Sequence, residues 1–116
     1  MEKAFDEVAL MERIDGDTEF LEETIEMLDE DSPDLLAKIR EAAASVDAEA
    51  IVSPAHTLKG MLSNFCADKA EQAALTVETM GRQQQMDEVA TAVDTLCHET
   101  EQLRKALHAF LDGNKS

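Results

Sequence analysis

The chain has 116 residues, with 26 Asp or Glu against 10 Lys or Arg, and so a formal net charge of −16 at pH 7. Such a chain is a poor partner for nucleic acid or an anionic membrane, because binding to either depends on positive charge. The length allows one domain with a real core, and scarce Gly and Pro with only four aromatic residues are typical of an all-α domain.

The first predicted element is a short amphipathic helix over residues 3–13, which covers one end of the domain. An Asp-Gly turn signal follows it, and either Asp17 or Thr18 can cap the next helix.

One long helix is predicted over residues 18–46, although Pro33 lies inside it. The apolar stripe keeps its phase across this proline, so we expect a kink between Asp29 and Ser32 rather than a break. The expected core positions alternate four and three residues apart: Leu21, Ile25, Leu28, Ser32, Leu35, Ile39, Ala42 and Val46.

Asp47 precedes the next predicted helix, residues 48–65. The pair Ser53-Pro54 leaves two alternatives open, because Ser followed by Pro is also a helix-start pattern. The helix either continues with a kink, which we favour, or a new helix begins at this pair. Its core stripe is Ile51, Ala55, Leu58, Leu62 and Phe65.

Two further helices complete the chain. The first covers residues 69–80, with Asp68 and Glu71 as a capping box and Gly81 as the stop. The second covers residues 86–111 and has an apolar stripe close to a heptad repeat. Together the elements predict an all-α, antiparallel, up-down four-helix bundle with a short additional N-terminal helix.

The run from Ala55 to Gly60 holds the candidate chemistry. At about 100° per residue, His56 points about 140° away from the core stripe, into solvent. An exposed imidazole is largely neutral at pH 7 and can therefore act as a nucleophile. Lys59 lies one turn on, where it can offset charge on a phosphoryl group, and Gly60 leaves space for a partner's backbone at a cost of about 1 kcal/mol in helix propensity.

The run His56-Thr57-Leu58-Lys59-Gly60 resembles the signature of histidine-containing phosphotransfer (HPt) domains, the relay modules of multistep two-component signalling. Pro54 is unusual for this family, and Cys66 stands where its members usually have Gly. The resemblance extends over about residues 14–82, and after the signature it includes Ser63, Asn64, Phe65, Ala67, Leu75, Glu78, Gly81 and Arg82.

The resemblance implies that His56, through Nε2, accepts a phosphoryl group from a receiver-domain phospho-aspartate and passes it to another receiver aspartate. Lys59 would neutralise charge, Gly60 would give the partner access, and Val52, Met61 and Ser63 would dock it. The partners would be receiver domains of response regulators or hybrid histidine kinases, and the chain itself could come from a hybrid sensor kinase.

We therefore expect a phosphoryl carrier rather than an enzyme, since no nucleotide-binding loop is present. It would need no cofactor of its own, because Mg²⁺ is expected on the partner receiver domain. Two alternatives stay open. The chain could be a helical adaptor that binds receivers without phosphotransfer, or the phosphoryl-carrying domain of a chemotaxis-type kinase.

The remaining reactive side chains suggest no second site. Cys66 and Cys97 have no metal-ligand spacing, and His98 and His108 lack a neighbouring Lys-Gly pair. No apolar run approaches the ~20 residues of a membrane span, and the start of the sequence lacks the apolar region of a signal peptide. We expect a cytoplasmic monomer that inserts in no membrane.

Overall fold

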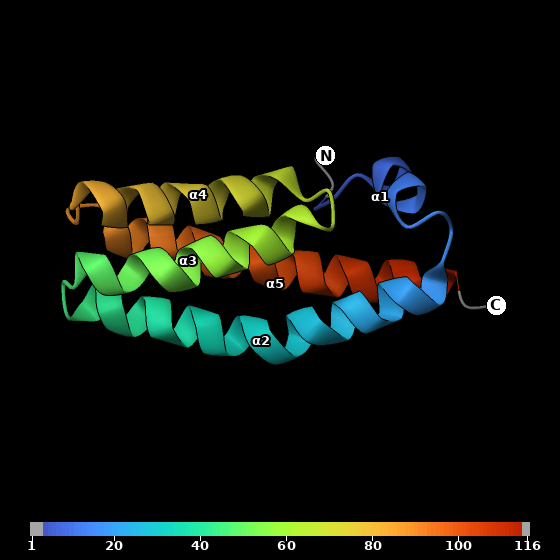
Figure 1. Cartoon of the computed structure of the whole chain (residues 1–116), viewed down its shortest axis with the longest axis horizontal. Coiled ribbons are helices and arrows are strands. Elements are labelled where there is room, and N and C mark those ends of the chain that lie inside the picture. The colour runs from blue at the N-terminus through green and yellow to red at the C-terminus, as the bar shows by residue number, and fades with distance from the viewer. Residues whose placement is uncertain (1–3, 115–116) are drawn as a thin grey trace.

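The computed structural model describes residues 4–114, which are all-α, as predicted, with five helices and no strand. The helices are α1 (Glu7–Arg13), α2 (Thr18–Ala44), α3 (Ala48–Ser63), α4 (Asp68–Gln83) and α5 (Val89–Gly113). Consecutive long helices run antiparallel, and α1 sits at one end (Figure 1). In the bundle α2 packs on α3 and α5, and α4 packs on the same two helices.

Aspartate residues start three of the helices. The carboxylates of Asp6, Asp17 and Asp47 each accept a hydrogen bond from the backbone N–H three residues on, at 3.0 to 3.2 Å. Of the two predicted caps for α2, Asp17 is the one used. Because Asp6 is a cap, α1 begins at Glu7 rather than at residue 3, which lies outside the described residues.

Several predicted helix ends were wrong. The second helix ends at Ala44 and not at residue 46, and Val46 is 68% exposed instead of being in the core. The third ends at Ser63 instead of 65, and the last covers Val89–Gly113 instead of 86–111.

The predicted signals at both ends of α4 were also wrong. Ala67 is its N-cap residue and makes no side-chain hydrogen bond, so Asp68 belongs to the first turn and forms no capping box. The helix continues past Gly81 and ends where Gln84 takes a left-handed conformation, with its N–H bonded to the Gly81 carbonyl.

Both prolines lie inside helices. The helix α3 continues through Pro54, which confirms the continuous alternative and excludes a new start at Ser53. The helix α2 likewise continues through Pro33, and its ribbon is bowed in Figure 1. A gently bent helix can wrap around a core, because its solvent-side hydrogen bonds lengthen.

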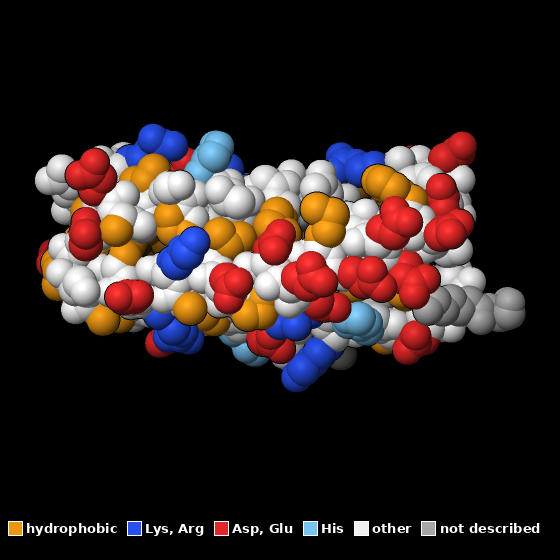
Figure 2. Space-filling model, turned by 60° about the horizontal axis from the view of Figure 1, so that its bottom comes forward, with side chains coloured by type: hydrophobic (Ala, Val, Ile, Leu, Met, Phe, Trp, Pro, Cys, Tyr) orange, Lys and Arg blue, Asp and Glu red, His pale blue; other side chains and the backbone are white. Residues whose placement is uncertain are grey.

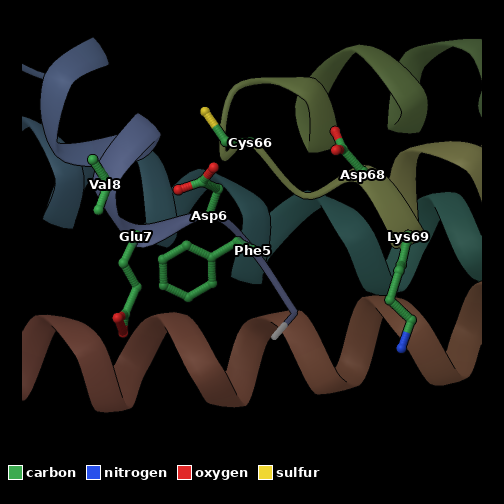
Figure 3. Close-up of a pocket in the computed structure, with 7 residues that line it drawn as sticks. All are labelled: Phe5, Asp6, Glu7, Val8, Cys66, Asp68 and Lys69. Carbon is green, nitrogen blue, oxygen red and sulfur yellow. The ribbon is translucent and has the colours of Figure 1, made fainter. Parts of the chain in front are cut away.

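The N-terminal segment closes the end of the bundle where α3 turns into α4. The N–H of Asp6 donates to the Cys66 carbonyl at 3.0 Å, and Arg13 Nη1 donates to the Ser63 carbonyl at 2.6 Å. Phe5 points toward α5 (Figure 3), where its ring meets Phe110 edge to face at 5.4 Å. These contacts tie the N-terminal segment to α5, to the end of α3 and to the connection that follows it.

Each connection between consecutive helices contains one non-glycine residue in the left-handed region. The residues are Asp15, Val46, Cys66 and Gln84, with φ angles between 53° and 56°. Their Cβ atoms make this conformation unfavourable, above all for β-branched valine. Glycine would adopt the same conformation at the position of Cys66 without this steric cost.

Gly81 allows α4 to approach α3 closely. A Cβ atom at this position would lie 2.9 Å from the Ala48 carbonyl oxygen and 3.1 Å from methyl groups of Ile51 and Val52. At Gly60, by contrast, an added Cβ would meet nothing within 4 Å. Glycine is therefore a packing requirement at 81 and not at 60.

We expect Gly81→Ala to lower the free energy of unfolding by about 1–2 kcal/mol. The added methyl group forces the backbone at Ala48 to move, and this cost outweighs the better helix propensity of alanine. The matched variant Gly60→Ala should raise it by up to about 1 kcal/mol. Urea unfolding of both variants measures these changes, and a stabilised Gly81→Ala variant would contradict the close approach.

Candidate functional site

The imidazole of His56 projects from the middle of α3 and is 61% exposed, as its angle from the core stripe predicts. Its Nδ1 lies 3.0 Å from Oε2 of Glu78, a residue of the neighbouring helix α4. The Glu78 side chain is only 4% exposed. The site therefore joins an exposed ring to a buried carboxylate.

Two cations hold the same carboxylate. Arg82, one turn further along α4, donates to Glu78 Oε2 from Nε at 3.1 Å and from Nη2 at 2.7 Å. Lys59 Nζ lies 2.8 Å from Oε1, and because this contact lacks hydrogen-bond alignment it acts as an ion pair. Glu78 is thus the centre of a cluster with three cationic or polar partners.

The cluster determines the ionisation of Glu78. Burial raises the pKa of this carboxyl, but the contacts with Lys59, Arg82 and His56 outweigh burial and lower the pKa to about 2. Glu78 is therefore an anion throughout the physiological range, and it can only accept hydrogen bonds.

The charge of Glu78 assigns the proton of the neutral His56 ring. Since a carboxylate is an acceptor, the ring nitrogen that faces it, Nδ1, carries the hydrogen. The other nitrogen, Nε2, then carries the lone pair. A carboxylate in this position also stabilises a positive charge that develops on the ring.

His56 and Arg82 lie along an open groove of about 610 Å³ between α3 and α4. Val52, Ser53 and Gly81 form part of its lining, so the close approach at Gly81 also shapes the groove beside the imidazole. Arg82 is 57% exposed and Lys59 27% exposed, which leaves both cations open to a bound anion.

Of the residues predicted to give access to a partner or to dock it, only one lines the groove beside His56. Gly60 has open space beside it, and Val52 lines the groove. Met61 is half-buried and packs against the core, whereas Ser63 Oγ donates to the Gly60 carbonyl at 2.7 Å within its own helix. The structure therefore brings Val52, but neither Met61 nor Ser63, to the groove.

Sequence reasoning did not assign Glu78 and Arg82 to the site. A charged residue next to the Ala74 and Val77 stripe, with an arginine four residues on, is the local signal for a buried ion pair. Their distance from His56 in the chain conceals the contact until α3 and α4 are paired.

Other candidate sites lack this combination. The hollow of about 390 Å³ in Figure 3, lined by Phe5 and Cys66 among others, contains none of the predicted site residues. His108 Nε2 is paired with Asp29 at 2.6 Å on α2, and His98 is exposed. Within residues 4–114 no group of His, Cys, Asp and Glu could hold a metal ion.

The structure thus combines an exposed imidazole with a buried carboxylate on a bundle of four long helices. The family model described as "Hpt domain" matches residues 23–110, more than half of the chain, and the chain therefore belongs to the Hpt family. Hpt domains are phosphotransfer carriers in two-component phosphorelays, and they interact with receiver domains of response regulators.

Comparison with curated proteins and with solved structures gave no match. None of the helices in the described part of the chain combines the length and apolar character needed to cross a bilayer.

Proposed function

We propose that His56 is the phosphoryl-carrying residue, that Nε2 is its reactive atom, and that receiver domains are its donors and acceptors. The observation that carries this proposal is the contact between His56 Nδ1 and the buried, ionised Glu78. With the Nδ1 hydrogen directed at this carboxylate, the lone pair of the neutral ring is on Nε2, and the His56 side chain is 61% exposed.

In the proposed transfer, the Nε2 lone pair attacks the phosphorus atom of a receiver's aspartyl phosphate. The N–P bond forms as the P–O bond to the aspartate breaks, and the aspartate leaves as a carboxylate. Because Nδ1 keeps its proton, the product is a phosphorylated imidazolium, whose positive charge faces the Glu78 carboxylate. The reverse transfer to another receiver follows the same path, and the receiver brings its own Mg²⁺.

Lys59 and Arg82 supply positive charge around the reacting group. Phosphoryl transfer depends mainly on positioning the reacting groups and on neutralising the negative charge of the equatorial phosphoryl oxygens. Both cations touch Glu78 and remain partly exposed, so each can reach toward a phosphoryl oxygen while the carboxylate stays paired. Gly60 serves access, since its missing side chain leaves space that the fold itself does not use.

His56→Gln tests the proposal in an assay with radiolabelled phospho-receivers from the organism's receiver set. Wild-type protein should become labelled with phosphate that is acid-labile and base-stable, and His56→Gln should lose all labelling. The control is His98→Gln, which changes another exposed histidine and should be labelled like wild type.

Two results would contradict the proposal. Normal labelling of His56→Gln would exclude this residue as the carrier. Tight binding of a receiver with no labelling of wild-type protein would favour a helical adaptor.

A further inference from the structure

The pair Ser53-Pro54 lies one turn before His56 on α3 and has no part in the transfer proposed for His56. Pro54 has no N–H, so α3 lacks one backbone hydrogen bond at this turn, although the helix continues through it. Ser53 is exposed and lines the same groove as His56 and Arg82. This turn of α3 is therefore part of the immediate surroundings of the imidazole.

The hydroxyl of Ser53 is free to bind a ligand. Helical Ser and Thr side chains commonly donate to a carbonyl three or four residues earlier in their own helix. Ser63 donates in this way to Gly60 at 2.7 Å, and Thr95 donates to Thr91 at 3.1 Å. Among the described residues Ser53 Oγ has no hydrogen-bond partner, so its O–H can be donated to a group bound in the groove.

Helix geometry places Ser53 on the side of His56 that faces away from α4. At about 100° per residue, Ser53 lies about 60° from His56 in one direction around α3, and Lys59 lies about 60° from it in the other. Lys59 and His56 Nδ1 both contact Glu78 on α4. Helical side chains also incline toward the N-terminus of their helix, so the imidazole is inclined toward the turn that contains Ser53. A phosphoryl group on Nε2 would thus have Lys59 on one flank and Ser53 on the other.

A phosphoryl group needs hydrogen-bond donors on this protein, because the surface is strongly acidic. The chain has a net charge of −16, and Figure 2 shows Asp and Glu side chains spread over one face of the molecule. A bound phosphoryl group adds a charge of about −1.5 to −2 at pH 7. Of the residues that line the groove only Glu49 is acidic, and it lies about 10 Å along the helix axis from His56. The Ser53 hydroxyl can therefore donate a charge-assisted hydrogen bond to the group without a carboxylate close by.

We propose that Ser53 is a further catalytic residue of the transfer, which donates a hydrogen bond from Oγ to an oxygen of the phosphoryl group that His56 receives. This inference rests on the role proposed for His56. The serine keeps its proton and forms no bond to phosphorus, so the bonds made and broken in the transfer stay the same. The hydrogen bond positions the phosphoryl group between Ser53 and the cations Lys59 and Arg82, and positioning is a main source of catalysis in phosphoryl transfer.

The test compares kcat and KM for transfer from the receiver that labels His56 fastest. Ser53→Ala should lower kcat about tenfold and change KM by less than about twofold, since it removes a hydrogen bond to a charged group at the reacting centre. Alanine is the better helix former, so this variant should fold like wild type. Ser53→Thr keeps a hydroxyl and should retain most of the wild-type kcat. Ser53→Asp should lower kcat further than alanine does, because a carboxylate repels the phosphoryl oxygens.

Thr95→Val is the matched control. It removes a hydroxyl from an exposed residue of α5 that does not line the groove, and it should leave kcat and KM unchanged. Phosphorus NMR of the phosphorylated protein gives a second measurement. The phosphohistidine signal should shift in Ser53→Ala, because the phosphoryl group loses a hydrogen bond, and it should stay in place in Thr95→Val.

Phosphoramidate separates this role from receiver docking, because this small donor transfers its phosphoryl group to the ring nitrogen with loss of ammonia and has no docking surface. Ser53→Ala should slow labelling by phosphoramidate about as much as it slows transfer from the receiver. Unchanged rates with both donors, or a loss confined to the receiver reaction, would overturn the role of Ser53 and leave that of His56 intact. Failure of both donors to label wild-type protein would overturn both proposals.

Discussion

Glu78→Gln is expected to lower the free energy of unfolding by about 3 kcal/mol at pH 7, because the folded state lowers the pKa of this carboxyl from 4.5 to about 2. The folded protein therefore releases this proton more readily than the unfolded chain. The stabilisation is fully present above about pH 4.5, and it is lost as the pH falls toward 2.

Urea unfolding of wild type and Glu78→Gln between pH 7 and pH 3 measures this effect. The difference between the two proteins should shrink as the pH falls below 4.5. Asp94→Asn is the control, since Asp94 also pairs with an arginine but is 70% exposed, and a pair in solvent contributes at most about 1 kcal/mol. A difference that does not vary with pH would show that Glu78 contributes through packing and not through its charge.

Removing both cations of the site should have the largest effect on transfer after loss of His56 itself. In the double variant Lys59→Met, Arg82→Met we expect the rate of transfer at saturating receiver to fall about 100-fold, in line with the loss of groups that stabilise developing charge. KM should change much less, because both residues act at the reacting group.

The single variants and Lys38→Met complete this experiment. Each single variant should lose less than the double one, since the remaining cation still faces the phosphoryl group. Lys38 is an exposed lysine on α2 outside the groove, so Lys38→Met should retain the wild-type rate. Unimpaired transfer by the double variant would exclude both cations from the chemistry.

The helices of this domain could be predicted because their apolar spacing is nearly unbroken. The stripe predicted that α2 continues across Pro33, and continuation of α3 across Pro54 was the favoured of two alternatives; the structure confirms both. Helix ends were less predictable, because they depend on neighbouring elements. Val46 has the right spacing for the core, but the chain has already left the helix in a left-handed turn.

Only the part of the site that lies on a single helix, α3, could be predicted from the sequence. His56 and Lys59 lie one turn apart on α3, so their proximity follows from helix geometry alone. Glu78 lies 22 residues beyond His56, and its contact depends on the register between α3 and α4. Gly81 shows the same limit, since it looks like a helix stop until the approach of Ala48 is known.

The non-glycine residues with left-handed backbone between the helices are positions where substitution by glycine could stabilise the protein. Glycine at Val46 or Cys66 would remove a backbone strain of about 1 kcal/mol. Part of this gain is lost, because glycine has greater conformational freedom in the unfolded chain. The two turns are separate, so their contributions should add. A more heat-resistant scaffold is thus within reach while every side chain around the imidazole stays as it is, and receiver pairing could then be redesigned upon it.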